Sequence, residues 1–164
     1  MYDFKPAPGI DPAESYRPLA EAARSLTAGE PDAVANMANV AALIWEFVPE
    51  LNWAGFYRVT EDRGVKELVL GPFVGRPACI RIPIGQGVCG TAAQTGQTQL
   101  VADVHSFPGH IACDSASESE LVVPILRDGE VIAVIDCDSP RTGRFSETDA
   151  TGLEQLAGIL AERV

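Results

Sequence analysis

The sequence lacks a basic excess, a long apolar run and a leader. It has 12 Lys and Arg against 23 Asp and Glu, so its formal net charge is −11. Nucleic-acid backbones and anionic membranes bind clustered cations, and we therefore expect neither partner. No apolar stretch approaches the roughly 18 residues of a membrane span, and residues 1–9 lack the features of a signal peptide. These absences predict a cytoplasmic protein.

The sequence also lacks closely paired cysteines. Its four cysteines are Cys79, Cys89, Cys113 and Cys137. Structural zinc sites usually place two ligands two to four residues apart, so we expect no resident metal ion and no cofactor. A mixed site of His105, His110 and Cys113 is the weaker alternative. Because cytosolic thiols stay reduced, each cysteine is expected to be a reagent or a buried apolar side chain.

The apolar pattern of the first third is helical. Residues 1–11 have no periodicity and are expected to form a flexible arm before one domain at 12–164. Helical spacing predicts one helix that Ser15 caps and Gly29 ends, and a second between Pro31 and Pro49. The second helix has a predicted core stripe of Val34, Met37, Ala38, Ala41, Ile44, Trp45 and Val48.

From residue 53 the pattern is typical of short strands. The predicted strands are 53–59, 67–70, 78–83, 98–104, 120–126 and 130–136. Glycines at 85–90 lead into a short helix ending near Gly96, and Asp128-Gly129 predicts a tight hairpin turn. Ser146 and Asp149 are spaced to cap a last helix. The order predicts an α+β fold with a mainly antiparallel central sheet flanked by helices.

The cysteines differ in their predicted surroundings. Cys113 lies in a polar loop, where it is either a reactive thiol or an idle one, and neighbouring Asp114 would raise its pKa. Cys79 and Cys89 border the glycine-rich turn and could approach Cys113 in space. Cys137 lies on a strand with the opposite facing to its two neighbours, which favours a buried, inert thiol.

Three acidic residues lie at strand ends that one hairpin would bring together: Glu120, Asp136 and Asp138. They are either solvated strand ends or a cluster that binds an ammonium group and supplies a proton. Trp53 and Tyr57, four residues apart on one strand, share a face and form either core or an aromatic wall for a small ligand.

Together these segments resemble a known family. The motifs are LNWAGFY at 51–57, LGPF at 70–73, ACIRIPIGQGVCG at 78–90, GHIACD at 109–114 and SE at 119–120. They closely resemble the free methionine-(R)-sulfoxide reductases, over about four-fifths of the chain. The resemblance implies that 12–164 is a GAF-like catalytic domain, that free methionine sulfoxide is the substrate, and that the protein is a homodimer.

The resemblance also implies roles for the thiols. Cys113 matches the family's nucleophile, Cys79 its principal resolving cysteine and Cys89 a third thiol of the relay. A thiolate would reduce the sulfoxide and become a sulfenic acid, a second cysteine would convert it to a disulfide, and thioredoxin would reduce the disulfide. Cys137 departs from the aliphatic residue usual at its position, and the connection at 61–66 is longer than in familiar members.

The remaining matches define the predicted substrate pocket. Trp53 and Tyr57 match pocket aromatics, Glu120 the acid beside the sulfoxide oxygen, and Asp136 and Asp138 the carboxylates that hold the ammonium group. Its two acidic neighbours would keep Glu120 protonated near neutral pH. The alternatives are a thiol redox switch, which needs no aromatic wall, and a GAF module that senses a small ligand without turnover.

Overall fold

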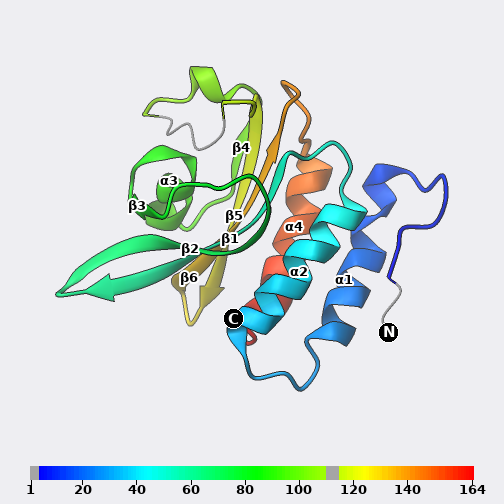
Figure 1. Ribbon diagram of the computed structural model, residues 1–164, viewed down its shortest axis with the longest axis horizontal. Helices are drawn as coiled ribbons and strands as arrows, with labels where there is room; N and C mark the ends of the chain where they lie inside the picture. Colours follow the sequence, from blue (N-terminus) through cyan, green and yellow to red (C-terminus); the bar gives the residue numbers. More distant parts are fainter. Residues whose placement is uncertain (1–3, 110–114) are drawn as a thin grey trace.

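A six-stranded antiparallel sheet separates two unequal groups of helices in this computed structural model, which describes residues 4–109 and 115–164 (Figure 1). The α-helices are α1 (Tyr16–Leu26), α2 (Ala33–Phe47), α3 (Gly87–Thr95) and α4 (Glu147–Leu160). The strands are β1 (Trp53–Asp62), β2 (Val65–Gly75), β3 (Arg81–Pro83), β4 (Gln99–Val101), β5 (Ser119–Arg127) and β6 (Glu130–Ser139). Short 3₁₀ turns cover Pro12–Glu14 and Val104–Ser106. The predicted α+β class is confirmed.

The sheet order is β3-β2-β1-β6-β5-β4, and every neighbouring pair is antiparallel. Two hairpins build its centre. Arg63-Gly64 and Asp128-Gly129 form their turns, with positive φ at all four residues, which suits the twist of paired strands. The predicted Asp128-Gly129 turn is therefore confirmed. In the connection at 61–66, strands β1 and β2 stay paired up to the Arg63-Gly64 turn, so the extra length forms paired strand rather than loop.

Helices α2 and α4 cover one face of the sheet with α1 packed on their outer side, and α3 lies on the other face (Figure 1). The predicted core stripe of α2 is partly wrong: Val34 is 52% exposed, Trp45 is 39% exposed, and Ala38 is exposed as well. Val40 and Phe47 are buried instead. Because α2 is apolar around much of its circumference, its periodicity does not select one face, and contacts with α1 and the sheet decide it.

The predicted helix caps have different outcomes. The Ser15 hydroxyl does not cap α1; it donates to the Pro12 carbonyl at 2.6 Å, because Ser15 itself has helical backbone angles. Ser146 forms the predicted cap of α4, accepting the Asp149 N–H, while the Asp149 carboxylate accepts the Ser146 N–H at 2.7 Å. This reciprocal pair fixes where α4 begins, at the end of the loop that follows β6.

The outer strands are shorter than predicted. Only Arg81–Pro83 of 78–83 and Gln99–Val101 of 98–104 pair as strand. Both are edge strands with a single partner strand, so the strand ends where the chain turns away from that partner. In the predicted arm, Phe4 packs against the core that α1, α2 and α4 form with the sheet. Among the described residues, no helix combines the length and apolarity needed to cross a membrane.

Candidate active site

Three neighbouring strands place three of the predicted pocket residues in one row. In the β1–β6 ladder Trp53 pairs with Asp138, and in the β5–β6 ladder Glu120 pairs with the same Asp138. Directly paired residues of a sheet point to the same face. The antiparallel register therefore brings an aromatic residue and two acidic residues from distant segments onto the α3 face of the sheet.

Alternation along β6 sorts its thiol from its carboxylates. Asp136 and Asp138 are two residues apart and share the α3 face, while Cys137 between them points to the opposite face. Cys137 has no exposed surface and belongs to the core under α1, α2 and α4. Its predicted burial is confirmed. Burial raises the pKa of its thiol well above the usual value, with the nearby Asp136 adding to the effect.

Helix α3 places a second thiol against the carboxylates. Gly90 allows the helix to approach β3 closely, since a Cβ there would lie 2.5 Å from the Pro83 carbonyl oxygen. The Cys89 Sγ then lies 3.9 Å from Glu120 Oε1. This sulfur, one Glu120 oxygen and one Asp136 oxygen all lie within 4.8 Å of one another, and all three residues are buried. These are side chains that can ligate a metal ion.

Burial dominates the electrostatics of this cluster. It is the largest cause that raises the pKa of Glu120 well above its ordinary value, and repulsion from Asp136 and Asp138 comes second. The sequence analysis predicted a raised pKa of Glu120 from the repulsion alone, and the repulsion contributes less to the shift than burial does. Burial also raises the pKa of Asp136, to about 7. Burial likewise raises the pKa of Cys89 well above its usual value, and both buried carboxylates add to it.

One oxygen of the cluster has no partner. Asp136 is 6% exposed, and its Oδ1 accepts no hydrogen bond from any residue in 4–109 or 115–164. A buried acceptor without a donor costs stability, and an ionised one costs more. The cluster therefore favours either a bound proton or a bound cation.

Stacked aromatic rings form a wall beside the carboxylates. Trp53 stacks on Tyr57 with ring centroids 5.9 Å apart, and on Phe73 at 5.2 Å. Sequence reasoning missed Phe73; the signal was its place on β2 opposite Gly55, where a Cβ would lie 2.4 Å from that of Phe73. The missing side chain at Gly55 makes room for the neighbouring strand.

The aromatic residues also hold the segment that joins β2 to β3. The Tyr57 hydroxyl donates to the Cys79 carbonyl at 3.0 Å, and the Trp53 Nε1–H donates to the Arg76 carbonyl at 3.1 Å. Cys79 is disulfide-bonded, while Cys89 is a free thiol. The same rings thus form the wall and fix the backbone of a predicted resolving cysteine.

Of the residues predicted for a mixed zinc site, only His105 lies in the described part of the chain. Cys113 and His110 lie outside the described residues. His105, offered for a mixed zinc site, is exposed and lies with its Nε2 3.4 Å from Glu118 Oε2.

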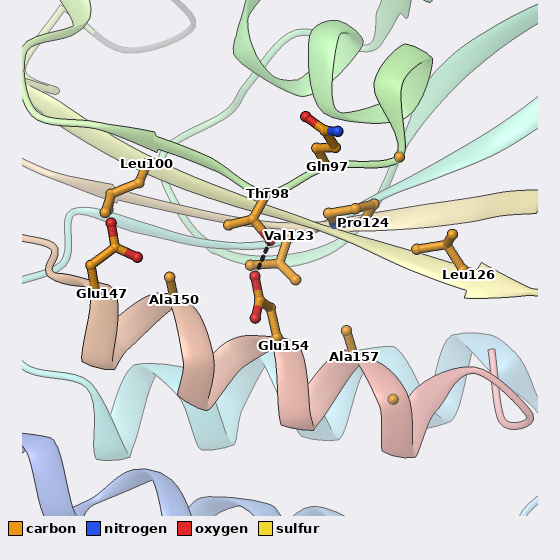
Figure 2. A pocket seen from close by; sticks show the side chains of 12 residues that line it. Gln97, Thr98, Leu100, Val123, Pro124, Leu126, Glu147, Ala150, Glu154 and Ala157 are labelled. Atoms are coloured by element: carbon orange, nitrogen blue, oxygen red, sulfur yellow. Dashed lines mark hydrogen bonds between the residues drawn. The ribbon is translucent and has the colours of Figure 1, made fainter. Parts of the chain in front are cut away.

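A separate hollow lies on the other face of the sheet. A groove of about 630 Å³ lies between α4 and the β4–β5 edge (Figure 2). In it, the Thr98 hydroxyl donates a hydrogen bond to Glu154 Oε1 at 2.6 Å. Its lining contains no cysteine and none of the buried carboxylates. It is therefore distinct from the candidate site.

Comparisons with known proteins agree with this architecture. The family model of the GAF domain matches residues 34–163. The chain belongs to the GAF-domain family. It is 47% identical to the free methionine-R-sulfoxide reductase of Escherichia coli over 151 residues, covering 92% of this chain and 89% of that protein. The reductase of the same name from Saccharomyces cerevisiae is 46% identical, covering 82% of this chain and 77% of that protein.

A solved structure extends the likeness to three dimensions. The free methionine-R-sulfoxide reductase of Neisseria meningitidis, in complex with its substrate, superposes with a TM-score of 0.92 at 46% identity. The match covers 99% of this chain and 95% of that one. Within the GAF-domain family, this chain therefore belongs with the free methionine-R-sulfoxide reductases, as its motifs predicted.

Proposed function

We propose that this protein reduces free L-methionine-(R)-sulfoxide to L-methionine. The observation that carries the proposal is the group of three carboxylates, with Glu120 and Asp136 buried, beside a stacked aromatic wall, which provides a cation site next to an apolar one. The named relatives support the reaction class. Asp136 and Asp138 bind the substrate's ammonium group, and Trp53 and Tyr57 contact its methylthio end.

The chemistry uses two thiols and one acid. The Cys113 thiolate attacks the sulfoxide sulfur while Glu120 gives a proton to the sulfoxide oxygen. The oxygen passes to Cys113 as a sulfenic acid, and methionine leaves as the reduced product. Cys79 then attacks the sulfenic sulfur, which forms a disulfide and releases water. The raised pKa of Glu120 supports its role, because an acid must hold its proton near neutral pH.

The disulfide is re-reduced by a thioredoxin-type dithiol, and Cys89 is a third thiol that joins this thiol–disulfide exchange. The protein works in the cytoplasm as a homodimer. Selection for the free amino acid follows from the acidic cluster, because a methionine sulfoxide residue inside a protein has no ammonium group to bind there.

The test is methionine release from the separated R and S epimers of free methionine sulfoxide, with dithiothreitol as reductant. A sulfoxide-containing peptide is the control substrate. We expect turnover of the free R epimer alone, its loss in Cys113→Ser, and its retention in Cys137→Ser. Folded, reduced protein that turns over neither epimer would contradict the proposal and favour a redox switch or a ligand sensor. Activity in Cys113→Ser would move the nucleophile to Cys79 or Cys89.

A further inference from the structure

The position of Cys89 exceeds what binding an ammonium group requires. The carboxylates of Asp136 and Asp138 are enough for an ammonium ion, yet the Cys89 sulfur lies within 4.8 Å of an oxygen of both Glu120 and Asp136. We propose that Cys89, Glu120 and Asp136 bind a thiophilic divalent cation, of which Zn²⁺ is the expected one, and that this ion inhibits the protein by excluding the substrate's ammonium group. The second half of this proposal rests on the proposed function.

The distances suit a tetrahedral ion. Zinc–sulfur and zinc–oxygen bonds of about 2.3 and 2.0 Å separate sulfur from oxygen by roughly 3.5 Å at a tetrahedral centre. The Cys89 Sγ and Glu120 Oε1 are 3.9 Å apart, so small rotations of the two side chains bring them into range. Three protein ligands leave the fourth position to a water molecule.

The partnerless oxygen of Asp136 is the second observation. Its carboxylate is more than nine-tenths buried, and Oδ1 receives no hydrogen bond within the described segments. A cation held by the cluster compensates this buried charge.

The thiol decides which cation is preferred. Carboxylates alone would favour Mg²⁺ or Ca²⁺, whereas a cysteine ligand favours zinc and its soft relative cadmium. Cys89 is a free thiol in the state in which Cys79 is disulfide-bonded. The site is therefore available without reduction of the protein.

The direct test uses this oxidised state, because the disulfide removes Cys79 from competition for metal. Cd²⁺ is titrated into chelator-treated protein while the ultraviolet thiolate-to-cadmium charge-transfer band is followed, and Zn²⁺ is titrated by calorimetry. We expect one ion per chain. Cys89→Ser should abolish the band, and Asp136→Asn should weaken both metals by more than about tenfold. Cys137→Ala removes the other thiol that is free among the described residues, which lies in the core, and should leave binding unchanged.

Absence of the band, or a band that persists in Cys89→Ser, would overturn the metal site. The inhibitory role is tested separately, by turnover of the free R epimer at increasing Zn²⁺. We expect a rise in apparent KM at constant kcat, and an unchanged KM would overturn the exclusion. If metal-free protein has no activity, the proposed function fails, while the cadmium titration still decides the metal site.

Discussion

Replacing Asp136 by Asn should stabilise the substrate-free protein while weakening its cation site. The Asp136 carboxyl is buried, and its pKa of about 7 compares with an ordinary value of 3.8. The folded state holds the Asp136 proton more tightly than the unfolded chain does. The carboxyl therefore lowers the free energy of unfolding above pH 3.8, and this loss increases with pH until about pH 7. An uncharged amide at the same place removes this pH dependence.

The magnitude follows from the two pKa values. The difference between the folded and ordinary pKa values of Asp136, at 1.36 kcal/mol per pKa unit, corresponds to about 4 kcal/mol. This is the full loss of stability caused by the ionised carboxylate above pH 7. A buried amide also loses solvation, at about 1–3 kcal/mol, although its N–H groups can donate to the neighbouring Glu120 or Cys89. The net gain at pH 8 should therefore be about 1–3 kcal/mol, equivalent to about 2–4 °C in Tm for each kcal/mol.

The assay is urea unfolding of wild-type protein and Asp136→Asn between pH 4 and pH 8, without substrate. The variant's advantage should grow by about 1.4 kcal/mol per pH unit up to about pH 7 and then level off. The matched control is Glu162→Gln, which removes an exposed carboxylate and should follow the wild-type protein within about 0.5 kcal/mol. An advantage independent of pH, or a variant less stable than wild type at pH 8, would refute the reasoning.

Three further predictions concern the scaffold. Ser146→Ala should cost about 1 kcal/mol in urea unfolding, because it removes one half of the reciprocal cap of α4; no change would mean that packing alone fixes the helix start. Gly152→Ala should cost about 1–3 kcal/mol, since its Cβ would lie 2.2 Å from Tyr16 Cγ, and an unchanged Tm would show that α1 can move away. Sedimentation equilibrium should give a homodimer, and a monomer at working concentration would contradict the resemblance.

Short-range patterns were enough to predict several features. The Asp128-Gly129 turn, the Ser146 cap and the opposite facing of Cys137 depend on residues within a few positions of one another. The turn alone would place Glu120 opposite Cys137, and the register shift between Ile125 and Leu126, which the local pattern does not show, places it opposite Asp138. The motifs also predicted the family that the comparisons show.

The tertiary structure alone decided which groups are buried together. Cys89 meets Glu120 and Asp136 only because α3 packs on the sheet, and this burial, more than the repulsion visible in the sequence, raises the carboxyl pKa values. Phe73 joins the aromatic wall because Gly55 has no side chain. Local patterns record backbone preferences and facing, whereas desolvation depends on contacts between segments far apart in the chain, which periodicity does not encode.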